Sequence, residues 1–557
     1  MSSPTSSFSS HSPNRRFFND KIDHGPGLSS IEEEDVKLNQ LGVRRELRKE
    51  FTNFSTISFA MGVLGCAASI ASTMNTPLLY GGPATAVWAW FMGSFGCLAI
   101  AASVAELVSA YPTSGGIYTC TAFVVPKNYR ASVTFVAGWM TIMGQLATPA
   151  SVTFALSQMI FAAATIGTDG TFVASTGQIL GLYVGLTVFI GILNSLPTKS
   201  LHRLISAFVY FNILTTLAII IAVPAAGSGH LASHKFVWTE IIDGSGWNNR
   251  GFAFLLGLLS VQWVMTDYDG AAHLSEEVKN AAVVAPVAIV SAVGITSVLG
   301  FFTNISICYG IRDMNALPGP TGLVFSQVLW DNLGKRGALA LWSFVIIVQI
   351  MTAISCQLAC IRSIYAISRD NALPDRRLFA KVWSRTGTPV NAVILTVVIA
   401  TVFGLLYLAS IVAINAVFSI TAVALDVSYM IPVIAKVCIS LQKRPSVKFI
   451  PGPFSLGKWS IAINVYAILW TCLETGVLIM PQLHPVTAST MNYAGSIMGG
   501  VCGLSWIWFK LYWHRYYHGP GGVDVLPFDQ GKDNLEIDDV PEKAASPAIE
   551  VKTYLRE

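Results

Sequence analysis

The sequence is poor in charged residues. Asp, Glu, Lys and Arg make up 12% of its 557 residues, against about 25% in soluble domains. Hydrophobic residues make up 53%, and the mean hydropathy is +0.57. The net charge of +4 is small and dispersed, which argues against a nucleic-acid partner. This composition excludes an ordinary soluble domain and predicts a multi-pass protein of the lipid bilayer.

Several other signals are missing. The nine cysteines lie in or beside apolar segments, without the spacing of metal ligands, so we interpret them as small core residues. The opening MSSPTSSFSSHSPNRR contains no apolar run, so we do not expect a cleaved signal peptide. The sequence has no Gly-rich phosphate loop and no Ser/His/Asp arrangement that can be placed. We therefore expect neither an enzyme nor a cofactor or metal.

Twelve apolar segments are long enough to span a bilayer. They lie at roughly 55–79, 84–109, 132–161, 175–196, 204–226, 251–274, 284–310, 337–366, 389–408, 411–436, 459–480 and 492–513. We expect them to form one all-α transmembrane domain over residues 51–513. Residues 1–50 are predicted to be a disordered cytoplasmic tail, and residues 514–557 a second cytoplasmic tail.

Lys and Arg are distributed unequally between the predicted loops. If the N-terminus is cytoplasmic, the cytoplasmic loops hold sixteen of these residues and the outer loops five. Basic residues accumulate on the cytoplasmic side of membrane proteins. We therefore expect both termini to be cytoplasmic and the loop 227–250 to lie outside. The plasma membrane is the favoured location, and the vacuolar membrane is the alternative.

The predicted span 251–274 stops behaving like a membrane helix halfway along. Its second half carries Thr266, Asp267 and Asp269, and a carboxylate at the bilayer centre costs at least ~2.5 kcal/mol unless it faces protein, water or a ligand. On a regular helix the two aspartates would point about 200° apart. An unwound backbone, favoured by Gly270, would let both face one object. We interpret this segment as a helix broken at a solute site, with a polar packing face as the alternative.

The first span, 55–79, is the other candidate for an interrupted helix. Gly62, Gly65 and the small residues up to Ser69 weaken a helix and can expose backbone groups to a ligand. A tight helix-packing face is the rival interpretation, since Gly65 and Ser69 are four residues apart. Two interrupted helices in corresponding halves indicate the binding site of an inverted-repeat transporter. The halves would be 55–226 and 251–436, followed by extra helices within 459–513.

Four motifs give the chain a resemblance to a known family. They are the segment YGGP at 80–83, ELVSAYPTSGGIY at 106–118, DYDGAAHLSEE at 267–277 and SRDNALP at 368–374. With the small-residue first span, they resemble the fungal amino acid/choline transporter branch, especially its GABA-permease-like members, of the amino acid–polyamine–organocation (APC) superfamily. The resemblance covers about 45–515. It says little about the substrate, because close relatives carry GABA, other amino acids, choline or polyamines.

The resemblance implies a LeuT-type fold, in which two five-helix repeats of inverted topology are followed by two additional C-terminal helices. It also implies that backbone and small residues of the first helix bind a substrate carboxylate. These residues correspond to Gly65, Cys66, Ala67, Ala68 and Ser69. The resemblance further implies that the aromatic Trp263 closes over the substrate.

The remaining candidate substrate contacts rest on charge and polarity. Asp269 matches an acidic position of the family, yet the motif does not decide whether Asp267 or Asp269 meets a substrate amine. Thr266 belongs to the same polar stretch. Gln145 and Gln349 are expected to line the cavity, although most such groups only bridge helices.

Seven residues are candidates for proton coupling or for a gate. They are Glu106, Asp269, His273, Glu276, Glu277, Asp426 and Glu474. Buried acids without a paired base suggest that one of them exchanges a proton in each cycle. Glu276 and Glu277 can form an ionic latch with the Arg-rich loop 362–385, which would be weak if exposed. His273 either titrates or makes a structural hydrogen bond.

The resulting expectation is a secondary active transporter that imports GABA or a related small amino acid. The expected partners are a small amine-bearing solute and a proton, which would move by symport with alternating access. A choline or polyamine permease of the same fold is the alternative within this class. A solute-sensing transceptor without net transport is the alternative from another class, and a channel fits two half-helices at a closed site less well.

Overall fold

The computed structural model describes residues 51–520 except 410, 443–446 and 489. Within these ranges the chain is helical, and its one β interaction is an isolated bridge between Phe51 and Val278. The α-helices are α2 (Asn53–Leu64), α3 (Cys66–Thr73), α4 (Asn75–Gly81), α5 (Pro83–Ala110), α6 (Gly116–Val124), α7 (Lys127–Gly167), α8 (Thr176–Asn194), α9 (Thr198–Ile205), α10 (Phe208–Ala226), α11 (His234–Thr239), α12 (Arg250–Leu256), α13 (Leu258–Met265), α14 (Gly270–His273), α15 (Ala281–Tyr309), α16 (Val324–Arg369), α17 (Val390–Ala409), α18 (Ile411–Leu441), α19 (Ser460–Leu478) and α20 (Ala494–Leu511).

Ten helical stretches of the described chain are long and apolar enough to cross a membrane. Each overlaps one of the predicted spans. The predicted span 251–274 is present as α12, α13 and α14, and the span 492–513 is present as α20, which has 18 residues. The count of twelve spans stays a prediction.

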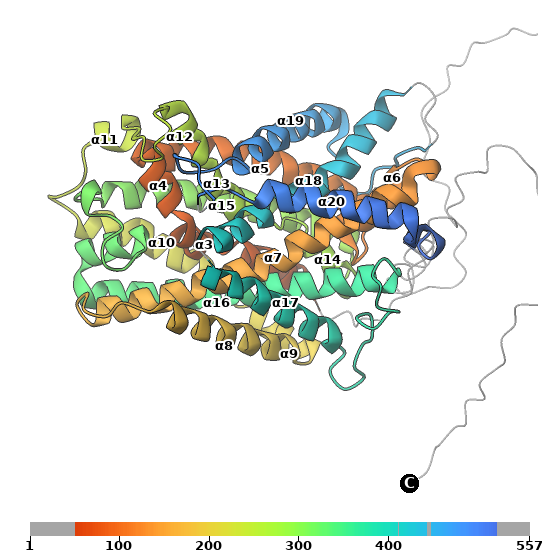
Figure 1. Ribbon diagram of the computed structural model, residues 1–557, viewed down its shortest axis with the longest axis horizontal. Helices are drawn as coiled ribbons and strands as arrows, with labels where there is room; N and C mark the ends of the chain where they lie inside the picture. Colours follow the sequence, from red (N-terminus) through yellow and green to blue (C-terminus); the bar gives the residue numbers. More distant parts are fainter. Residues whose placement is uncertain (1–50, 410, 443–446, 489, 521–557) are drawn as a thin grey trace, which may run out of the picture.

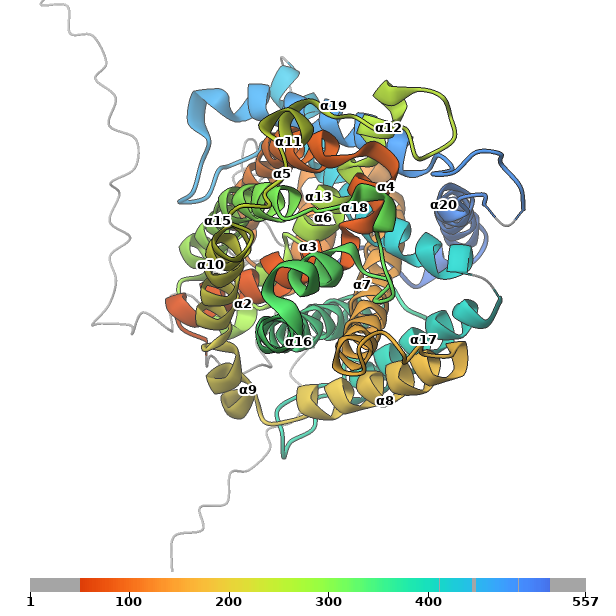
Figure 2. The same ribbon diagram turned by 90° about the vertical axis from the view of Figure 1, so that its left-hand side faces the viewer.

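The long helices run side by side along the longest dimension of the molecule (Figure 1). Viewed along that direction, α3 and α13 lie in the interior among α7, α16 and α18, whereas α8, α17, α19 and α20 lie at the rim (Figure 2). Burial follows this arrangement: 89% of the most apolar window of Asn53–Gly81 is buried, against 22% of that of Thr176–Asn194. The first span is therefore surrounded mostly by protein, whereas Thr176–Asn194 has most of its surface available to lipid.

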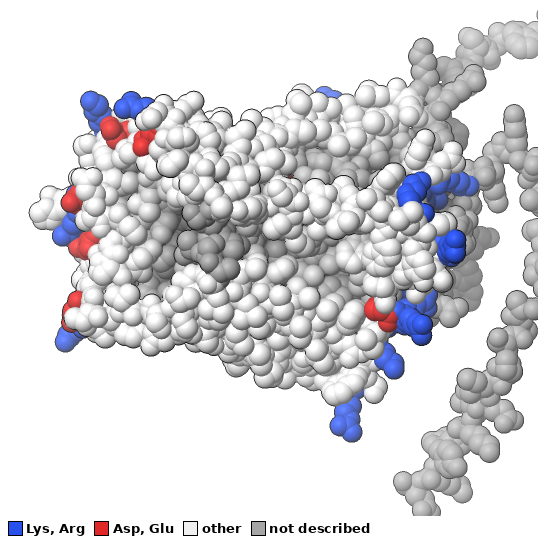
Figure 3. Space-filling model, viewed as in Figure 1, with Lys and Arg blue, Asp and Glu red and all other residues white. Residues whose placement is uncertain are grey.

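Charged side chains gather at the two ends of the molecule. On the face shown in Figure 3, Lys, Arg, Asp and Glu lie at both ends and a broad band between them is almost free of charge. Large hydrophobic residues are exposed on the long helices, among them Phe95 of α5, Ile221 of α10 and Leu504 of α20. Such a band suits the hydrocarbon core of a bilayer.

The nine cysteines are free. Six of them are buried, as expected for small core residues. Cys438, Cys472 and Cys502 are exposed, so the interpretation as core residues is wrong for these three. Their helices α18, α19 and α20 pack with only part of their surface against the rest of the protein.

Candidate functional site

The first span is interrupted at Gly65. α2 ends at Leu64, Gly65 has φ 51° and ψ 49°, and α3 starts at Cys66. This left-handed conformation favours glycine. A Cβ atom at Gly65 would also lie 2.0 Å from Thr352 Oγ1 of α16. The sequence predicted this interruption, but the space beside Gly65 is filled by α16 and is not open to a ligand.

The second interruption lies between α13 and α14. The helix ends at Met265, Thr266 is extended, and Asp267 has φ 65°. Asp is among the few residues that adopt this conformation without a large cost. Gly270 N–H donates to the Asp267 carbonyl at 3.0 Å, and α14 then begins. The chain is therefore unwound where two carboxylates follow each other closely.

The two aspartates of this break have different partners. Gln145 Nε2 of α7 donates to Asp267 Oδ1 at 2.6 Å. Tyr429 of α18 donates its hydroxyl to Asp269 Oδ1 at 2.6 Å, and His273 Nε2 lies 3.2 Å from Asp269 Oδ2. Asp267 Oδ2 has no hydrogen-bond partner among the described residues. Asp269 Oδ2 also accepts no hydrogen bond, but it lies at ion-pair distance from His273, whereas Asp267 Oδ2 has neither kind of partner among the described residues.

His273 joins this cluster to the segment that follows α5. Its Nδ1 lies 2.9 Å from the carbonyl oxygen of Ser114, so Nδ1 must carry a proton, because a carbonyl only accepts. Its Nε2 lies near both Asp269 Oδ2 and Gln145 Nε2, the latter at 3.5 Å. The structural hydrogen bond that the sequence left as one option for His273 is therefore present.

A small cavity of about 10 Å³ touches both interrupted helices. It is lined by Val63, Ser69, Thr148, Val152, Trp263, Val264, Thr266, Asp267, Cys356 and Thr421. The Thr266 hydroxyl, the Trp263 Nε1 and Asp267 Oδ2 are buried without a hydrogen-bond partner in the described chain. Buried polar groups are normally satisfied. These three groups therefore mark a place where a polar ligand would complete the hydrogen bonding.

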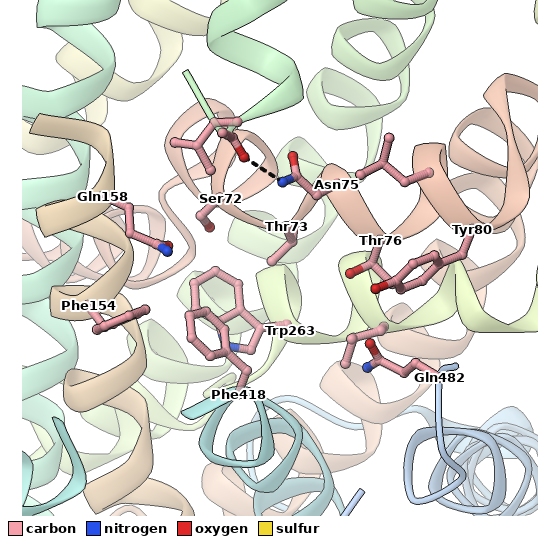
Figure 4. A pocket seen from close by; sticks show the side chains of 14 residues that line it. Ser72, Thr73, Asn75, Thr76, Tyr80, Phe154, Gln158, Trp263, Phe418 and Gln482 are labelled. Carbon is pink, nitrogen blue, oxygen red and sulfur yellow. Dashed lines mark hydrogen bonds between the residues drawn. The ribbon is translucent and has the colours of Figure 1, made fainter. Parts of the chain in front are cut away.

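A larger cavity of about 270 Å³ lies beyond Trp263 (Figure 4). Its lining includes Ser72, Thr76, Tyr80, Gln158 and Gln482. The rings of Trp263 and Phe418 lie 5.4 Å apart at 30° and form part of its wall. Trp263 also lines the small cavity, so this aromatic pair separates the two spaces. Trp263 thus lies beside the small cavity, and its closure over a substrate, which the resemblance implied, stays a prediction.

Two ion pairs join the short turn after α14, Ser275–Glu277, to α16. Arg362 Nε lies 2.6 Å from Glu277 Oε1, with both side chains 1% exposed. Arg369 NH1 lies 3.0 Å from Glu276 Oε2, and Ser114 donates to the same carboxylate. Burial raises the pKa of the Glu277 carboxyl, and the nearby Arg362 guanidinium opposes that shift. The latch considered from the sequence is thus formed by contacts that are buried, not exposed.

Glu106 has a paired base. It accepts hydrogen bonds from Lys436 of α18 and, at 2.7 Å, from the Ser460 hydroxyl of α19. The Leu456 N–H also donates to it at 3.2 Å. The expectation that the buried acids lack paired bases is therefore wrong for Glu106, as it is for Asp269. Glu106 joins α5 to α18 and α19 and does not line either cavity.

The remaining predicted residues lie in different places. Cys66, Ala67 and Ala68 are fully buried in the first turn of α3. Gln349 Nε2 donates to the Val152 carbonyl at 3.1 Å, and Gln349 is not among the residues lining the small cavity. Asp426 and Glu474 are buried on α18 and α19. Nothing in the sequence singled out Phe418 or Tyr429, because their roles depend on which face of α18 meets the break.

Comparison with known proteins places the chain in a family. A family model described as "Amino acid permease" matches residues 51–502. An uncharacterised amino-acid permease of Schizosaccharomyces pombe is 38% identical over 518 residues, which cover 90% of this chain and 95% of the relative. Amino-acid permease 2 of Neurospora crassa is 34% identical, covering 89% and 90%. The GABA-specific permease of Saccharomyces cerevisiae is 29% identical, covering 92% and 88%.

The fold resembles that of a solved transporter. MhsT, crystallised with L-phenylalanine, superposes with a TM-score of 0.51 at 14% identity and covers 82% of this chain and 99% of its own. At this identity the likeness concerns the fold alone, and it confirms the predicted LeuT-type helical fold. The chain is a multi-pass membrane protein that belongs to the amino acid permease family of the APC superfamily, a family of transporters.

Proposed function

We propose that this permease imports GABA or a related small amino acid together with protons, by alternating access. The observation that carries the proposal is the small cavity that both interrupted helices line, with the free Asp267 oxygen on one side. The similarity to a GABA-specific permease supports the choice of substrate.

The two sides of the cavity suit the two ends of a zwitterion. α3 begins at the first break, and the first N–H groups of a helix have no partner within it. These groups and the helix dipole favour a carboxylate. Asp267 Oδ2 favours an amine. Choline has no carboxylate, so it would leave the α3 side of the site unsatisfied.

The cavity must enlarge before it holds a substrate. About 10 Å³ is the space that one water molecule needs, and an amino acid is several times larger. The larger cavity of about 270 Å³ beyond Trp263, here called the outer cavity, is already present. On the other side, ion pairs hold the turn after α14 against α16. We infer a conformation that is closed around the site and sealed on the predicted cytoplasmic side.

Radiolabelled uptake in a permease-deficient fungal host tests this proposal. We expect accumulation of GABA that rises as the external pH falls and collapses with a protonophore. Competition by neutral amino acids, choline and spermidine ranks the alternatives. If choline or spermidine strongly inhibits uptake and GABA has no effect on it, the substrate assignment is overturned. Binding without net uptake would favour the transceptor.

Replacing Gly65 by Leu is expected to abolish uptake. The sequence suggested that the added side chain would fill a backbone binding site, but its Cβ would instead collide with Thr352 and force a strained left-handed conformation. The variant should therefore lose transport through a displaced α3. The measurement is uptake per surface-exposed transporter. Gly65→Leu combined with Thr352→Ala should recover part of the activity only if the collision is the cause.

The predicted topology is checked by cysteine labelling of intact cells. Cys438, Cys472 and Cys502 are exposed and are first replaced by Ser. Ser233→Cys, ahead of α11, should then react with an impermeant maleimide because the loop 227–250 is predicted to lie outside. Ser384→Cys, between α16 and α17, should react only after permeabilisation. Both positions are exposed, so the opposite pattern would overturn the topology.

A further inference from the structure

Asp426 and Glu474 form a carboxyl pair inside the protein. Asp426 is fully buried on α18, and Glu474 of α19 is 1% exposed. α18 packs against α19, and the two carboxyl groups are neighbours across this contact. Two neighbouring buried carboxyl groups cannot both ionise without a large cost, and one shared proton removes that cost.

The described surroundings of the pair supply no positive charge. The titratable groups that face it are Cys97 of α5, Tyr268 of the second break, Asp269 and Tyr429 of α18. No described Lys, Arg or His is among the groups acting on either carboxyl. The pair therefore differs from Glu106, which has Lys436, and from Asp269, which has His273.

The carboxyl oxygens are also short of donors. Asp426 Oδ1 and both oxygens of Glu474 make no hydrogen bond of good geometry with the described residues, although Trp470 Nε1, which donates to Gln262, lies near Glu474. Gln262 donates to Asp426 Oδ2 at 2.9 Å, and the same amide nitrogen donates to the Tyr268 hydroxyl at 3.2 Å. Both hydrogens of that amide are then in use. A proton held between the carboxyl groups supplies the donor that the protein lacks.

The pair is connected to the candidate substrate site. Gln262 precedes Trp263, which separates the two cavities, and Tyr268 lies between Asp267 and Asp269. Gln262 also accepts hydrogen bonds from Cys97 at 3.3 Å and from Trp470 at 3.4 Å. A change in the charge of the pair therefore acts on α13, which carries Trp263, and on the break after α13, which carries Asp267.

We propose that Asp426 and Glu474 bind the proton that is co-transported with the amino acid. This inference rests on the proposed proton symport. With the site closed, the pair holds one proton and a net charge of −1. When water reaches the pair from the cytoplasmic side, the proton passes to water and two carboxylates remain. Water stabilises their separated charges while the site is open, and after the empty transporter has returned, the pair takes up its next proton from the outer side.

Reconstituted transporter in proteoliposomes tests the assignment. The probe is an equimolar mixture of radiolabelled GABA and the protein amino acids, and a trapped pH dye reports proton entry. With an inward gradient of two pH units, one proton per solute supports accumulation of up to about 100-fold, since each unit is a tenfold factor. Without a gradient, exchange of internal for external solute measures the transport cycle independently of the proton.

Glu474→Gln and Asp426→Asn should retain exchange but lose accumulation driven by the gradient, together with the pH dependence of uptake and substrate-dependent proton entry. The charge-preserving swap of Asp426→Glu with Glu474→Asp should retain accumulation. Asp331→Asn is the matched control. This half-buried acid of α16 accepts from Gln327 at 2.8 Å and is not among the groups acting on either carboxyl of the pair, so its loss should change neither readout.

The outcomes separate the two proposals. Wild-type accumulation with unchanged single variants would overturn the pair and leave proton symport intact. Exchange without any accumulation in the wild type would overturn proton symport itself. If the single variants fail to fold, the swap decides, because exchange without accumulation in the swap would contradict a shared-proton site.

Discussion

Replacing Asp267 by Asn is expected to weaken amino-acid binding at least about 30-fold. Losing an amine–carboxylate contact in a dry site costs on the order of 2–5 kcal/mol. Asn keeps the shape of the side chain and can still accept the hydrogen bond from Gln145. The substitution therefore removes the charge next to the small cavity with little change in packing. The measurement is the substrate dissociation constant of purified protein, with surface expression checked in cells.

Asp269→Asn is the matched control for this prediction. Its oxygens already face Tyr429 and His273, so a substrate amine has no free oxygen to bind there. We expect this variant to keep substrate affinity within a few-fold of the wild type. If Asp269→Asn loses affinity and Asp267→Asn does not, the amine is bound at Asp269. Normal affinity in both variants would place it elsewhere.

The two interruptions could be predicted because their causes are local. Gly65 lies among small residues that form a weak helix. In the second segment, Asp267 and Asp269 are two acids that would point in different directions on a regular helix. Both signals depend on residues close together in the chain. The sequence also indicated where the second segment lies, because unwound backbone at membrane depth must be buried in protein or line a cavity.

The partners of the buried acids could not be predicted in the same way. Glu106 and Lys436 are 330 residues apart, and nothing near either residue indicates the other. Asp269 meets Tyr429 only because α18 turns that face toward the break. The same holds for Phe418, whose ring packs with Trp263. Such contacts follow from the packing of helices distant in sequence, which periodicity does not specify.

Gly65 illustrates how a correct position can have a different cause. The sequence suggested that glycine leaves room for a ligand, whereas the structure places Thr352 of α16 against it. The glycine allows α16 to approach and the backbone to turn, and Ser69, one turn further, lines the small cavity. The break thus brings Val63 and Ser69 to the wall of the small cavity, although Gly65 itself does not line it.

The contacts on the two sides of the site have different strengths. Toward the outer cavity, the barrier is the contact between Trp263 and Phe418. On the opposite side, α14 is held to α16 by two ion pairs, one of them almost completely buried. Removing one partner of a buried pair costs about 3–5 kcal/mol, because the other charge stays buried alone. If these pairs separate when the predicted cytoplasmic side opens, they set the balance between the two conformations.

Arg362→Ala is therefore expected to shift the transporter toward the conformation open to the cytoplasm, by about 100-fold or more in the equilibrium. Glu277 would be left without its partner in the closed state and would gain water in the open one. The readout is labelling of Thr76→Cys, whose position lines the outer cavity (Figure 4). An impermeant maleimide should label this cysteine more slowly in the Arg362→Ala background, and uptake should be lost.

Two further variants make this expectation specific to the buried pair. The charge reversal of Glu277→Arg with Arg362→Glu should restore part of the labelling, because it re-forms an ion pair in the same place. Lys335→Ala removes a pair with Asp169 in which the side chains are 39% and 68% exposed, and such surface pairs contribute little. Its labelling should match the wild type. Wild-type labelling in Arg362→Ala would show that the pair does not hold the cytoplasmic side closed, because the loss of a contact that distinguishes the two conformations must change their populations.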